Sequence, residues 1–120
     1  MDYIMSSASL FILMALVAGI SVPTQAGINA QLGLWTRSPV LAATISFAVG
    51  TLTLVIYTFA TRIPLPALAG IGAHPWWIWT GGVLGAFFVT ATIILVPKLG
   101  ATTMVTTVLA GQMFASLLLD

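Results

Sequence analysis

Long stretches without a charged residue constrain this chain more than any other feature of its sequence. Between Asp2 and Asp120 the only formal charges are those of Arg37, Arg62 and Lys98. Charged residues make up 4% of the chain, whereas soluble domains carry roughly 25% to cover a water-facing surface. A soluble domain of this composition would leave most of its exterior apolar. The sequence therefore predicts an all-α polytopic membrane protein.

Charges and prolines divide the chain into segments that are long enough to cross a bilayer. A hydrocarbon core of about 30 Å takes about 20 helical residues. We expect one transmembrane domain over residues 1–120, with four helices at about residues 4–34, 39–60, 77–96 and 101–119. The first helix is longer than a straight span requires, and Pro23 interrupts it and offers a kink.

The connections between these helices have the composition of turns and membrane entries. Residues 63–75 are rich in proline and glycine and are interpreted as a loop. Trp76, Trp77 and Trp79 follow at once, and indole rings favour the headgroup level of a membrane. Residues 97–100 predict a tight turn. The N-terminal segment lacks the basic start of a signal peptide, so we expect it to be retained.

The few cations give only a weak indication of orientation. Four crossings place both termini on one side of the membrane. Arg37 and Lys98 fall in the first and third connections, and Arg62 falls in the second. This bias slightly favours termini outside the cytoplasm, and because it is so small, insertion in both orientations is a hypothesis. The net charge of +1 gives no indication of a nucleic-acid partner.

Polar residues recur along one face of the first predicted helix. Ser21, Gln25 and Asn29 are spaced four residues apart and so share a face. An unpaired amide is costly in hydrocarbon, so this face must meet protein or water. Pro23 also frees the carbonyl of Gly19, four residues earlier. Such an interrupted helix can line a transport site, but the same amides could equally bond neighbouring helices together, and both interpretations stay open.

The fourth predicted helix carries a second polar pair. Gln112 and Ser116 are four residues apart, and we expect them to face the same polar interior as the first helix. Four threonines precede them and are interpreted as packing residues that bond to the preceding turn: Thr102, Thr103, Thr106 and Thr107.

Small residues at four-residue spacing predict where helices approach each other closely. They form three rows: Gly81 and Gly85 with Gly82 beside them, then Ala42, Ser46 and Gly50, then Gly111 and Ala115. Such rows support packing and give little information about chemistry.

The sequence contains no pattern that indicates an enzyme. No span carries an ionisable residue near its middle, and no catalytic triad, metal-ligand cluster, phosphate loop or cysteine occurs. His74 is a lone histidine in a predicted loop. We therefore expect no enzymatic activity, no cofactor and no bound metal.

Four segments of the chain resemble a known family. Residues 18–33, AGISVPTQAGINAQLG, resemble the first helix of the YdcZ-like family of short bacterial inner-membrane proteins. This family belongs to the drug/metabolite transporter superfamily, alongside the small multidrug resistance proteins. The other matching segments are SFAVGT at 46–51, WIWTGGVLGA at 77–86, and Gly111-Gln112 together with Asp120.

The resemblance implies a location, an assembly and a set of site residues. It implies a multi-pass protein of the bacterial inner membrane that pairs with a second copy or a homologous half, with an antiparallel arrangement favoured. The family's polar positions fall here on Gln25, Asn29, Gln112 and Asp120, the last a candidate coupling carboxylate. The first helix lacks the glutamate that small multidrug resistance proteins use, so their proton coupling cannot be carried over. The family pattern also has a fifth helix after the aspartate, so this chain resembles a five-helix fold without its last helix.

These observations favour a small transporter protomer that works as a dimer by alternating access. The expected substrate is small and polar or weakly polar, because amides offer no counter-charge to a cation. The alternative is a non-transporting membrane scaffold or accessory subunit. The residues expected to line the substrate path are Ser21, Gln25, Asn29, Gln112 and Ser116. Those expected at hinges and helix contacts are Pro23, Gly50, Gly81, Gly82, Gly85 and Gly111.

Overall fold

The structure is a computed structural model that describes residues 6–120. Within this range four long helices follow one another: α1 (Ser7–Thr36), α2 (Pro39–Ala60), α3 (Gly81–Leu99) and α4 (Ala101–Leu119). Each is long and apolar enough to cross a membrane, α3 together with the turn that begins at Trp76. The prediction of an all-α membrane protein with four transmembrane helices is confirmed. The expected start of the first helix, at residue 4, lies outside the described residues.

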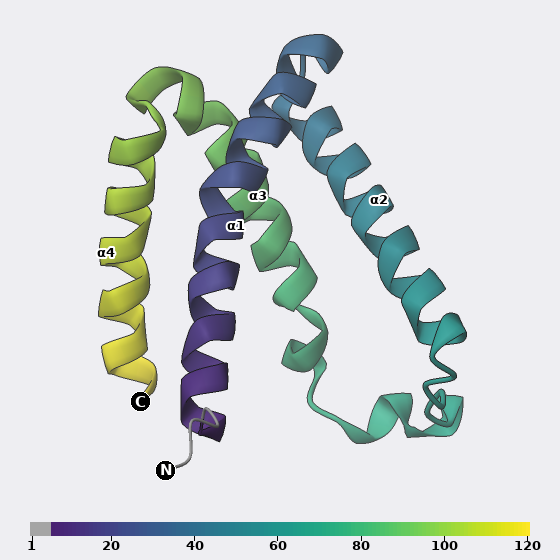
Figure 1. The fold of residues 1–120 in the computed structure, drawn as a ribbon. Helices are drawn as coiled ribbons and strands as arrows, with labels where there is room; N and C mark the ends of the chain where they lie inside the picture. Colours follow the sequence, from purple (N-terminus) through teal and green to yellow (C-terminus); the bar gives the residue numbers. More distant parts are fainter. Residues whose placement is uncertain (1–5) are drawn as a thin grey trace.

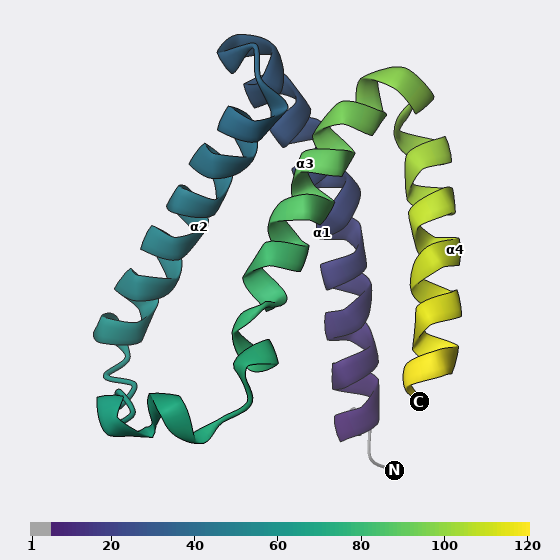
Figure 2. The same ribbon diagram turned by 180° about the vertical axis from the view of Figure 1, so that it is seen from behind.

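The two central helices, α1 and α3, cross each other, and α2 and α4 lie on opposite sides of them (Figures 1 and 2). The α1–α2 and α3–α4 connections lie at one end of the molecule. The chain termini and the segment between α2 and α3 lie at the other end (Figure 1). We call these the connection end and the terminal end.

Helix α1 is continuous through its proline. Pro23 lies inside the helix, where it removes one backbone donor without ending the helical run. The half of α1 after the proline leans towards α2, whereas the half before it runs beside α4 (Figures 1 and 2). This change of direction lets one long helix contact all three others.

Local sequence explains the short turn between α1 and α2. Arg37 ends α1 in the left-handed region at φ 58°. Ser38 caps α2, and its hydroxyl accepts the N–H of Leu41 at 3.2 Å. Pro39 occupies the first turn of α2, where its missing donor has no cost.

Two connections differ from the sequence-based expectation. The segment 63–75 contains a 3₁₀ helix, Leu68–Ala73, and a second one, Trp76–Trp79, precedes α3, which begins at Gly81. The third helix also continues through the residues expected to form a turn and ends at Leu99. Gly100 alone connects it to α4, at φ 81°, a conformation that a glycine adopts without a Cβ clash.

The buried core is small and consists largely of alanine and β-branched side chains. Ala42 and Ala43 of α2 pack with Val89 and Ile93 of α3. Around this cluster, α1 and α4 contribute the remaining buried apolar residues, Ala26, Ala30 and Met104. Most large apolar side chains of the chain are exposed, an arrangement that a lipid exterior accommodates and water does not.

Candidate functional site

The polar stripe of α1 runs from an exposed to a buried environment. Ser21 and Gln25 are exposed, whereas Asn29 is only 4% exposed. The Ser21 hydroxyl donates to the carbonyl of Ala18 at 2.6 Å, so its one donor is used within α1. Of the three residues, Gln25 is therefore the one placed with an accessible amide.

Gln25 lies in a groove between α1 and α2 with a volume of about 230 Å³. The α2 side of this groove is lined by Ser46, Phe47, Gly50, Thr51 and Leu54. Ser46 and Gly50 belong to the row of small residues predicted from the sequence, so that row faces the Gln25 amide. Most of the lining residues are exposed, which makes the groove open to its surroundings.

Gln112 lies in a different cavity, between α1 and α4, also with a volume of about 230 Å³. Gly19 and Val22 line it from α1, and Met104, Val105, Val108 and Leu109 line it from α4. Gly19 has no side chain, so it meets the cavity with its backbone. Pro23 has no N–H to donate to the Gly19 carbonyl. The cavity thus brings the Gln112 amide to the stretch of α1 where Pro23 leaves one backbone carbonyl without its helical donor.

The predicted polar residues therefore divide between two cavities on two sides of α1. Gln25 of α1 faces α2, whereas Gln112 of α4 faces α1. The Ser116 hydroxyl donates to the Gln112 carbonyl at 2.8 Å and is satisfied within α4. Asp120 follows the last turn of α4 at the terminal end, and its backbone N–H donates to the Ser116 carbonyl at 2.9 Å (Figure 1).

Two of the four threonines of α4 donate their hydroxyls to their own helix. Thr106 and Thr107 donate to the carbonyls of Thr102 and Thr103 at 2.8 and 2.9 Å. Thr102 and Thr106 nevertheless line a further space of about 270 Å³ together with Pro23. The α1 proline thus faces the first half of α4, on the same side as the Gln112 cavity.

Only two of the glycines are in close contact with another helix in the described chain. A Cβ placed on Gly33 would lie 2.9 Å from Ile93 Cγ2, and one placed on Gly85 would lie 3.4 Å from Phe47 Cζ. Gly33 is not among the contact residues predicted from the sequence, although its spacing from Asn29 places both on one face of α1. At the other predicted positions, a Cβ would meet no atom within 4 Å: Gly50, Gly81, Gly82 and Gly111. These four glycine positions remain uncovered by the described residues of one chain, and their roles stay predictions.

Comparison with known proteins gives one match. The family model described as "Putative inner membrane exporter, YdcZ" matches residues 10–120. No curated protein and no solved structure matches the chain significantly. The matched range contains all four membrane-spanning helices except the first three residues of α1. The resemblance inferred from the sequence is confirmed, and the chain belongs to the YdcZ family of multi-pass inner membrane exporters.

Proposed function

We propose that this chain is one protomer of a dimeric exporter that moves a small polar or weakly polar substrate by alternating access. The observation that carries the proposal is the pair of amide-bearing grooves on either side of α1. Each combines apolar lining residues with one to three hydrogen-bonding side chains, which is the usual composition of a small-molecule site. Each is smaller than the roughly 300–1,000 Å³ of typical ligand pockets, so a second protomer would complete them.

The uncovered small residues support the involvement of a second copy. Gly50 lies in the Gln25 groove, and no atom of the described chain approaches its Cβ position. At the start of α3, Gly81 and Gly82 likewise have no atom of another element near their Cβ positions. Small residues on an uncovered helix face let another helix approach closely within a membrane.

The proposed mechanism uses the divided shape of α1. The half before Pro23 lies against α4 and the half after it leans towards α2 (Figure 1). A change in the angle between these halves would open one groove while closing the other. In an antiparallel pair, the two protomers exchange these roles, so the inward-facing and outward-facing states have equal energies by symmetry.

Replacing Pro23 by alanine tests the hinge. The substitution restores an N–H that can donate to the Gly19 carbonyl, and alanine is favoured over proline in a helix interior by about 3 kcal/mol. We expect the thermal unfolding midpoint to rise or stay unchanged while transport falls severalfold. Flux and thermal unfolding are measured on the same preparation. A variant that is both more stable and fully active would contradict the hinge.

Orientation within the membrane tests the antiparallel arrangement. The chain has no cysteine, so a single introduced cysteine is the only thiol that a maleimide can label. Leu99→Cys marks the connection end and Ala73→Cys marks the terminal end. With a membrane-impermeant maleimide on intact cells, we expect each position to be labelled to about half. Complete labelling of one position and none of the other would leave the antiparallel pair without support.

Reconstitution into vesicles with a panel of neutral and weakly polar substrates tests transport itself. An exporter gives saturable flux that vanishes when the amides are removed. If the amides only held helices together, no saturable flux would appear, and amide variants would lose the dimer before any other property changed. That result would favour the scaffold alternative.

A further inference from the structure

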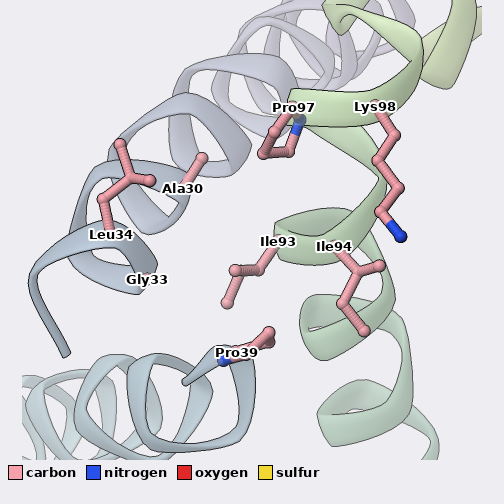
Figure 3. Close-up of a pocket in the computed structure, with 8 residues that line it drawn as sticks. All are labelled: Ala30, Gly33, Leu34, Pro39, Ile93, Ile94, Pro97 and Lys98. Atoms are coloured by element: carbon pink, nitrogen blue, oxygen red, sulfur yellow. The ribbon is translucent and has the colours of Figure 1, made fainter. Parts of the chain in front are cut away.

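An apolar cavity of about 400 Å³ lies at the connection end, away from both amide grooves (Figure 3). It is lined by the last turns of α1, the first residue of α2 and the end of α3. The lining residues are Ala30, Gly33, Leu34, Pro39, Ile93, Ile94, Pro97 and Lys98. Its volume is in the range of about 300–1,000 Å³ that small-ligand sites occupy.

Lys98 is the only charged residue in this lining. Its side chain runs back along α3 towards Ile94 (Figure 3). Arg37 lies in the α1–α2 turn, between the lining residues Leu34 and Pro39 in the sequence. Two of the three Lys and Arg residues of the chain thus belong to the connection end, Lys98 in the cavity lining and Arg37 in the adjoining turn.

These cations have no acidic side chain close to them in the described chain. The one carboxylate side chain among residues 6–120 is that of Asp120, at the terminal end (Figure 1). The nearby start of α4 also has no side-chain cap, so its first N–H groups can donate to an anion. The connection end therefore combines cations and free backbone donors with an apolar cavity.

We propose that this cavity binds an anionic phospholipid, with an acyl chain between α1 and α3 and the phosphate between Lys98 and Arg37. Apolar lining suits a hydrocarbon chain, and basic pockets between transmembrane helices are known to hold anionic headgroups. A free phosphate would leave the apolar cavity empty, whereas a phospholipid satisfies both parts of the site. This lipid site is separate from the proposed transport path, and lipid binding there does not depend on the proposed mechanism.

Native mass spectrometry of the detergent-solubilised protein tests the proposal. We expect phosphatidylglycerol to bind more tightly than phosphatidylcholine with the same acyl chains. Because a Lys or Arg near a charged headgroup contributes about 1 kcal/mol, Lys98→Gln and Arg37→Gln should each weaken phosphatidylglycerol binding about fivefold. Arg62→Gln is the matched control: it removes the same charge at the terminal end and should leave binding unchanged. Equal binding of the two lipids, or an equal loss in Arg62→Gln, would overturn the proposal.

Two further variants distinguish the contribution of the headgroup to binding from that of the acyl chain. Lys98→Arg keeps the charge and should retain tight binding. Leu34→Trp fills part of the cavity from an exposed position, so it should weaken binding without a change of charge.

Glycerol phosphate added in excess should not displace the lipid; displacement would mean a free-anion site. If lipid bound the monomer but not the dimer, a second copy would be the occupant, and the proposal would be wrong.

Discussion

Replacing Gln25 or Gln112 by leucine should lower transport about tenfold or more while the protein remains folded and dimeric. In a dimer each substitution removes two amides, one from each protomer. A hydrogen bond contributes about 0.5–1.5 kcal/mol net, so two of them correspond to roughly 1–3 kcal/mol, and 1.4 kcal/mol is a factor of ten. Leucine is apolar and close in size to glutamine, so the groove walls should not collapse. Initial rates of flux into vesicles measure the effect.

Gln31 provides a matched control on the same helix. It is an exposed amide six residues after Gln25, which places it on a different face of α1 because each residue turns the helix by 100°. Gln31→Leu should transport at the wild-type rate. Ser21→Ala should also be close to wild type, because the Ser21 hydroxyl already donates to Ala18. If Gln31→Leu lost as much flux as Gln25→Leu, the loss would come from membrane insertion and not from a substrate contact.

Combining the two amide substitutions shows whether the grooves act together. Gln25 and Gln112 lie in different cavities of one chain, so independent effects should add in free energy. Dimerisation could instead bring one protomer's Gln25 groove to the other's Gln112 cavity. The double variant should then lose less transport, expressed as a free energy, than the sum of the losses in the two single variants. Additivity would place the two amides at separate steps of the transport path.

The sequence predicted the four spans because their determinants are local. The length of an apolar run and the positions of charges decide whether a segment crosses a bilayer, and no tertiary contact is needed. The Arg37-Ser38-Pro39 turn follows from the same kind of local rule, since capping and proline placement depend on a few neighbours. The end of α3 did not follow, because a helix can continue through Pro97 near its last turn, where few backbone bonds remain to be lost.

The arrangement of the polar residues depends on tertiary packing and could not be predicted in the same way. Periodicity places Ser21, Gln25 and Asn29 on one face of α1, but it does not show which neighbour that face meets. In the structure α1 changes partners along its length, so Asn29 is buried while Gln25 faces an open groove. Gln112 meets a different stretch of α1, at Gly19 and Val22, for the same reason.

The close contact at Gly33 shows why a glycine row in the sequence does not identify a helix crossing. GxxxG spacing predicted close helix contacts at Gly81 and Gly85. The closest approach instead involves Gly33, which belongs to none of the predicted rows of small residues. The position of a crossing depends on where two helices meet. That in turn depends on turn lengths and on the direction of α1 after Pro23.

Gly33→Ala should lower the free energy of unfolding by about 1–3 kcal/mol, the usual cost of adding a methyl group to a well-packed core. The new Cβ would lie 2.9 Å from Ile93 Cγ2. Ile93 is 4% exposed and β-branched, so its Cγ2 can move only by a change of χ1 or of the α3 backbone. Unfolding followed by tryptophan fluorescence in one detergent measures the change.

Gly27→Ala is the matched control for this prediction, because it makes the same change on the same helix where no atom lies within 4 Å of the new Cβ. Alanine is favoured over glycine in a helix by about 0.5–1 kcal/mol, so this variant should be slightly more stable than the wild type. Ile93→Ala alone should be destabilising because it leaves a cavity, but the Gly33→Ala methyl group would partly fill that space. The double variant should therefore be more stable than the sum of the two single changes predicts, with a coupling of about 0.5–3 kcal/mol. Simple additivity, or equal effects at Gly27 and Gly33, would show that α1 and α3 do not cross at this pair.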